Sequence, residues 1–73
     1  RSDLGLKLLG LQTVAERLRA GETAEGEPVD AALSLREVCS VFVARHVDRL
    51  PVVDAAGRPA GAIHFVDLLK PAP

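Results

Sequence analysis

The chain has 73 residues, a formal net charge of −1 and one cysteine. A chain of this length forms one domain at most, with a thin core, and one cysteine excludes an internal disulfide, so pairing or attachment to a larger protein is the remaining support. The balanced charge and the short apolar runs exclude a nucleic-acid-binding surface and a membrane span, which needs about 20 apolar residues.

The first 20 residues predict a helical lead-in. The leucines of LGLKLLGLQ (4–12) recur with helical spacing, although some also alternate as in a strand, and we favour the helix. TVAE (13–16) is a capping box, which predicts a short helix that ends at about Ala20, before Gly21. We therefore expect residues 1–20 to form this lead-in and residues 21–73 to form the main motif.

A second helix is predicted in the middle of the chain. Polar GETAEGEP (21–28) predicts a loop, and a brief extended piece should follow it. The capping box SLRE (34–37) then precedes apolar residues at three- and four-residue steps, which predicts a helix over about residues 35–46. Arg45 and His46 fall in its last turn, where positive charge is favourable against the helix dipole.

A hairpin and a short last helix are predicted after it. LPVV (50–53) and a second extended run (59–63) flank a turn sequence, which predicts an antiparallel hairpin with a loop of about five residues. The last helix should begin near Phe65 and end by Lys70. From Val29 onward the predicted order is β-α-β-β-α, an α+β fold, and a right-handed crossover makes its first strand parallel to one hairpin strand.

These segments together resemble one cystathionine-β-synthase (CBS) motif. The matching residues are SLRE with its helix, LPVVD (50–54), Gly57, GAI (61–63) and DLL (67–69). The resemblance covers roughly Thr13 to Lys70, and TVAERLR (13–19) is similar to the short helix that leads into many such motifs. CBS motifs work in pairs, called Bateman modules, so the resemblance implies a homodimer or a second motif.

The resemblance also implies a parent protein. The chain contains no methionine and begins inside a pattern, so we expect a fragment of something longer. CBS modules regulate the catalytic or transport domain to which they are appended, and a short segment of this kind is similar to the C-terminal tail of a glycine betaine or proline ABC transporter ATP-binding subunit. This implies a cytoplasmic regulatory domain that senses an adenine nucleotide or ionic strength through motif pairing.

A ligand site is implied where the last strand meets the last helix, GAIHFVD (61–67). Ligand-binding members carry there Gly, two apolar residues, Ser or Thr, two variable residues and Asp. The hydroxyl and the helix amides contact phosphate, and the Asp carboxylate accepts hydrogen bonds from two ribose hydroxyls. The candidate ligands are AMP, ATP or S-adenosylmethionine, and no obligatory cofactor is implied.

The sequence keeps the Gly and the Asp of this pattern but has His64 at the hydroxyl position. A ring N–H could donate to phosphate, but we favour a partly exposed junction residue. For Asp67 two alternatives stay open, a ribose contact or a favourable charge in the first turn of the helix. The candidate ligand-binding residues are Asp67, His64, Gly61, Ala62 and Ile63, with Val29, Leu50 and Pro51 on the base side for their apolar character alone.

No enzyme chemistry is predicted. The sequence shows no nucleophile–base pair and no carboxylate dyad, so we name no catalytic residue. Cys39, His46 and His64 lack the spacing of a zinc site, and Cys39 on the apolar helix face is interpreted as a structural thiol. Two functions remain, a regulatory sensor and a ligand-free dimerisation or interaction domain, and the missing hydroxyl at His64 favours the second.

Overall fold

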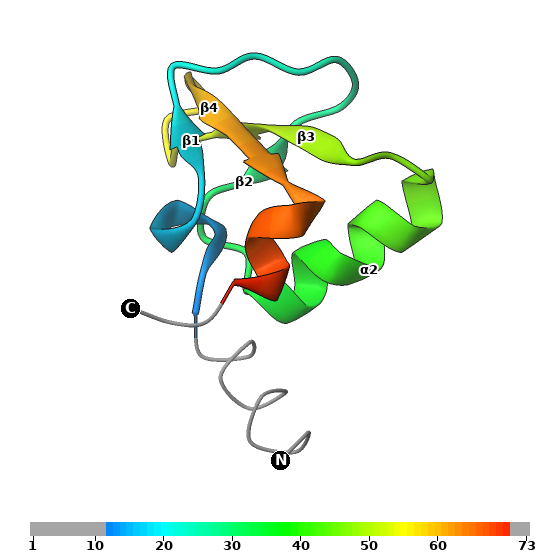
Figure 1. The fold of residues 1–73 in the computed structure, drawn as a ribbon. Helices are drawn as coiled ribbons and strands as arrows, with labels where there is room; N and C mark the ends of the chain where they lie inside the picture. The colour runs from blue at the N-terminus through cyan, green and yellow to red at the C-terminus, as the bar shows by residue number, and fades with distance from the viewer. Residues whose placement is uncertain (1–11, 71–73) are drawn as a thin grey trace.

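The computed structural model describes residues 12–70 as a four-stranded sheet with two 3-10 helices and one α-helix (Figure 1). The elements are η1 Val14–Glu16, β1 Arg19–Ala20, β2 Val29–Asp30, α2 Leu35–Arg45, β3 Arg49–Val53, β4 Pro59–His64 and η2 Phe65–Leu69. The strand order is β1-β4-β3-β2, and α2 and η2 lie together on one face of the sheet. The expected α+β class is confirmed.

The predicted order from Val29 onward is also confirmed. β2 is parallel to β3, with Val29 opposite Val52. β3 and β4 form the antiparallel hairpin, and the five residues between them, 54–58, make the turn. The Asp54 side chain stabilises that turn, because its Oδ1 accepts from the amides of Ala56 at 2.9 Å and Arg58 at 3.0 Å.

α2 begins and ends where the sequence predicted. The Ser34 hydroxyl accepts from the Glu37 amide at 3.0 Å, and the Glu37 carboxylate accepts from the Ser34 amide at 3.1 Å. These two bonds satisfy donors that the first helical turn leaves free. His46 closes the other end in the left-handed conformation, with φ of 56°, which histidine adopts more readily than most residues.

The hydrophobic core lies between the sheet and the two helices. Leu35, Val38 and Phe42 supply the buried face of α2, as its apolar spacing predicted. Phe42 meets Phe65 of η2 edge to face, with ring centroids 5.5 Å apart, so the chain's two aromatic rings pack together. The remaining buried core residues are Val14, Val29, Leu50, Val52, Ile63 and Leu68.

The predicted helix from Thr13 to Ala20 is wrong. The capping box forms a turn of only three helical residues, η1, and the chain then extends as β1 along the edge of β4. Backbone pairing explains the difference, because Arg19 and Ala20 pair with Ala62 and Gly61 of β4 and so cannot take part in a helix that continues to Ala20. These tertiary bonds override the helix propensity of the segment.

The rest of the predicted lead-in lies outside the described residues, since the structure describes nothing before residue 12. The division of the chain into 1–20 and 21–73 stays a prediction. β1 nevertheless joins the same sheet as the strands that follow residue 21.

β1 can approach β4 only because residue 61 is glycine. Gly61 has a φ of 149°, a conformation that L residues rarely adopt, and it lies opposite Ala20. A Cβ built on Gly61 would collide with the backbone carbonyl oxygen of Arg19. The match of Gly61 to the family pattern therefore has a structural reason that needs no ligand.

We predict that Gly61→Ala is much more destabilising than Gly26→Ala. Both positions have positive φ, which costs about 1–3 kcal/mol when a side chain is added, but Gly26 has open space around its missing Cβ. The collision with Arg19 adds to the cost at Gly61 alone. Urea unfolding of the two variants measures this difference, and equal losses of stability would contradict the steric role of Gly61.

Candidate functional site

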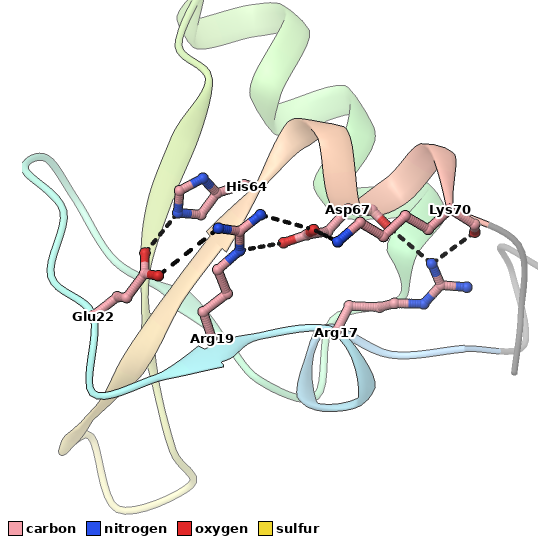
Figure 2. A network of polar contacts seen from close by, with 6 residues as sticks. All are labelled: Arg17, Arg19, Glu22, His64, Asp67 and Lys70. Atoms are coloured by element: carbon pink, nitrogen blue, oxygen red, sulfur yellow. Dashed lines mark hydrogen bonds and ion pairs between the residues drawn. The ribbon is translucent and has the colours of Figure 1, made fainter.

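β4 runs into η2 without a loop, and His64 is the residue at the junction. Its side chain does not cap η2; its Nε2 lies 2.7 Å from Glu22 Oε1 instead (Figure 2). A carboxylate only accepts hydrogen bonds, so the ring nitrogen is the donor. His64 thus attaches the loop after β1 to the end of β4, and the expected last helix is present as a short 3-10 helix.

Asp67 is the buried charge of this corner, with 4% of its surface exposed. Arg19 donates to both carboxylate oxygens, from Nε to Oδ2 at 2.9 Å and from Nη2 to Oδ1 at 3.1 Å. Lys70 Nζ lies 2.9 Å from Oδ1 (Figure 2). The Arg19 hydrogen bonds hold the pKa of Asp67 well below its ordinary 3.8 although burial opposes this, and Lys70 lowers it further.

Arg17 binds the backbone at the end of η2. Its Nη1 donates to the carbonyl oxygens of Asp67 at 2.7 Å and Lys70 at 2.8 Å, and its Nη2 donates to Gln12 Oε1 at 2.8 Å. The last carbonyls of a helix have no partner within it, so a guanidinium at this end satisfies them. Two arginines of one short segment therefore fix η2 (Figure 2).

A mostly apolar groove of about 290 Å³ lies between the loop after β1 and the hairpin strands. It is lined by Glu22, Thr23, Ala24, Gly26, Pro28, Pro51, Val52, Val53, Pro59 and Gly61. Known ligand pockets begin at about 300 Å³, so the groove lies at the small end of that range and has room for a base. Glu22 belongs both to this groove and to the polar contacts of His64 and Arg19.

The structure places the eight expected ligand-binding residues in three environments. His64 and Asp67 belong to the polar network, and Pro51 and Gly61 line the groove. The other four are core side chains that are at most 6% exposed, namely Val29, Leu50, Ala62 and Ile63. Glu22 belongs to both the polar network and the groove, whereas the four core residues lie in the protein interior. Ligand contact by any of the eight stays a prediction.

Sequence reasoning missed the basic partners of this corner, Arg17 and Arg19, and the acidic Glu22. The alternation in Arg17-Leu18-Arg19 was a usable signal, because Leu18 packs on the core while its two neighbours bind η2. Such alternation is typical of an edge strand. Because we predicted a helix for this segment, we did not interpret the alternation as a strand.

Within residues 12–70 no group of three or more His, Cys, Asp or Glu side chains is arranged to hold a metal ion. The same described range contains no helix with the length and apolar character needed to cross a membrane.

Comparison with known proteins identifies the family. The CBS domain family matches residues 27–72. The chain belongs to the CBS domain family. It is also 48% identical over 69 residues to the glycine betaine uptake system ATP-binding protein YehX of Escherichia coli (strain K12), a match that covers 94% of the chain and 22% of that relative. The chain therefore spans about a fifth of the length of this curated relative.

Solved CBS structures share the fold. The CBS domain of a bacterial CNNM/CorC family Mg2+ transporter has a TM-score of 0.58 at 23% identity, over 64% of this chain and 28% of that one. The cytosolic domain of the Mg2+ channel MgtE in complex with ATP has a TM-score of 0.56 at 28% identity, over 64% and 19%. CBSX2 in complex with AMP has a TM-score of 0.55 at 26% identity, over 64% and 35%.

We predict that Asp67→Asn lowers the melting temperature by about 5–10 °C near neutral pH, because the Arg19 hydrogen bonds lose their charged acceptor. The folded-state pKa of Asp67 lies below its unfolded value, so the stabilisation is complete above pH 5 or so and declines as pH falls below about 4.

Melting curves of the unmodified chain and of Asp67→Asn between about pH 7 and pH 2.5 test this. The difference between their melting temperatures should narrow only in acid. Asp48→Asn is the matched control, because the Asp48 side chain is 86% exposed and should give almost no gap at any pH. A gap for Asp67→Asn that stays constant with pH would contradict the assignment.

Proposed function

We propose that the chain is a regulatory, non-enzymatic CBS segment of an ATP-binding subunit that drives uptake of glycine betaine or proline, on the cytoplasmic side of the membrane. The observation that carries this proposal is the 48% identity over 69 residues to the glycine betaine uptake ATP-binding protein. The partner that the segment regulates is then the catalytic or transport domain of the parent protein. The family match over residues 27–72 supports assigning 21–73 to the CBS motif itself.

We further propose that the segment works as a pair, with a second copy or a second motif. Large apolar side chains are exposed on α2 and after it, Val43 and Val47, and on η2, Val66 and Leu69. Val43 and Val47 also line a hollow of about 140 Å³, together with Phe42 and Phe65. Apolar patches of this kind on a small domain favour a protein partner.

The proposed signal is an adenine nucleotide or a change in ionic strength. The groove beside Pro51 and Gly61 has space for a base, and structures of relatives hold AMP and ATP. S-Adenosylmethionine presents the same base and ribose. The ion pairs around Asp67 are formed by partly exposed Arg19 and Lys70, so dissolved salt should weaken them.

A ligand-free pairing domain is the second candidate. It is favoured by the occupancy of Asp67, whose two carboxylate oxygens already accept from Arg19 and Lys70. His64 has no hydroxyl to contact a phosphate, and its ring is hydrogen-bonded to Glu22. Both features favour the ligand-free domain.

We predict that saturating AMP, ATP or S-adenosylmethionine raises the melting temperature of the chain by a few degrees, because a ligand that binds only the folded state stabilises it. Asp67→Ala should abolish the rise, whereas Asp48→Ala, at an exposed side chain, should keep it. A thermal-shift panel measures both. No rise with any of the three compounds would favour the ligand-free domain.

We predict that the chain pairs in solution and that Leu69→Glu weakens the pair at least tenfold, since a buried unpaired charge at an interface is strongly unfavourable. Ala55→Glu, on the exposed hairpin turn, is the control and should leave pairing unchanged. Sedimentation equilibrium gives the dissociation constants, and a monomer at every concentration would contradict pairing through this surface.

A further inference from the structure

The carboxylate of Asp67 is covered by two cations of the same chain. Only 5% of the Asp67 side chain is exposed, against 38% for Arg19 and 63% for Lys70. Both carboxylate oxygens already accept hydrogen bonds. A ligand hydroxyl therefore reaches Asp67 only after Arg19, Lys70 or both have moved away.

Arg19 also lies between Asp67 and the groove. Its backbone packs against Gly61, which lines the groove, and its Nη1 lies 3.9 Å from Oε2 of Glu22, another lining residue. A shift of the Arg19 side chain would join the groove to the carboxylate. The joined space would extend a cavity that has room for a base toward an ionised acceptor for hydroxyl groups.

We propose that the ion pairs of Arg19 and Lys70 with Asp67 block this carboxylate, an arrangement that we call the lock. The site accepts a ligand's ribose hydroxyls only when these ion pairs open. Arg19 sets both the affinity of the site for the ligand and the dependence of that affinity on salt. This inference rests on the proposed function, because it assumes that the corner binds an adenine nucleoside. The inference adds that nucleoside binding and ionic strength act on the same two ion pairs, those of Asp67 with Arg19 and with Lys70.

Salt gives the lock a distinctive signature. The cations of these ion pairs are partly exposed while Asp67 is buried, so rising ionic strength weakens the pairs, though less than fully exposed ones. A hydrogen bond from a neutral hydroxyl to a carboxylate is screened less still. The binding of an uncharged nucleoside should therefore tighten with salt. Simple screening of a charged phosphate would act in the opposite direction, so adenosine, which has no phosphate, is the informative probe.

The test is calorimetric titration of the chain with adenosine at about 50 mM and about 500 mM potassium chloride, which changes the screening length roughly threefold. Affinity of the unmodified chain should rise about twofold with salt, less than for fully exposed ion pairs because Asp67 is buried. Arg19→Gln should bind more tightly at low salt and lose most of the rise. Lys70→Gln should show a smaller change of the same sign.

Arg36→Gln is the matched control, because it removes the same charge from an exposed position on α2. It should behave like the unmodified chain at both salt concentrations. Melting curves check that each variant is folded, and Lys70→Gln keeps the test decisive if Arg19→Gln is unstable, since the Lys70 side chain is mostly exposed.

The outcomes separate the two proposals. Adenosine binding that is equal in all four proteins and insensitive to salt would overturn the lock and leave nucleoside binding in place. Weaker binding by Arg19→Gln would also overturn it, because Arg19 would then be a ligand contact. No binding by any protein at either salt concentration would overturn nucleoside sensing and the lock together.

Discussion

The ion pair between Arg19 and Asp67 connects segments that are 48 residues apart in sequence. A buried carboxylate is stable only when its charge is matched, and the bidentate guanidinium provides that match. β1 contributes just two residues to the sheet, so this side-chain contact reinforces a weak edge. The position of η2 depends on this ion pair. The burial of Leu68 and the contact between Phe42 and Phe65 depend in turn on the position of η2.

The same contact connects stability to the candidate site. Arg19 contacts Glu22 and Glu22 contacts His64 (Figure 2), and Glu22, the middle residue of this series, lines the groove. A change at the corner therefore alters the loop that forms one wall of the groove. The polar contacts that hold this loop are partly exposed, which is typical of segments that open at low free-energy cost.

The parts of the fold that the sequence predicted are those with a strong local signal. α2 has a capping box and helical spacing of apolar residues, and the hairpin has one β-branched run and a second extended run around a turn. The CBS resemblance rested on these segments and is confirmed.

β1 had only a weak signal, the alternation in Arg17-Leu18-Arg19, because a two-residue strand is too short to show a clear period and its neighbours are good helix formers. The pairing of Asp67 with Arg19 was equally hidden, since it joins distant segments. At the candidate site the prediction located the polar corner and the glycine of the groove, and it missed Arg19 and Lys70, which occupy the carboxylate of Asp67.

Arg17 has a mechanical consequence. Its guanidinium joins the segment before β1 to the end of η2 through three hydrogen bonds of 2.7–2.8 Å, to Gln12 Oε1 and to the carbonyl oxygens of Asp67 and Lys70. A force that separates the segment before β1 from η2 acts on these side-chain bonds directly. The backbone ladder between β3 and β4 is not part of this contact, so η2 could detach while the hairpin stays paired.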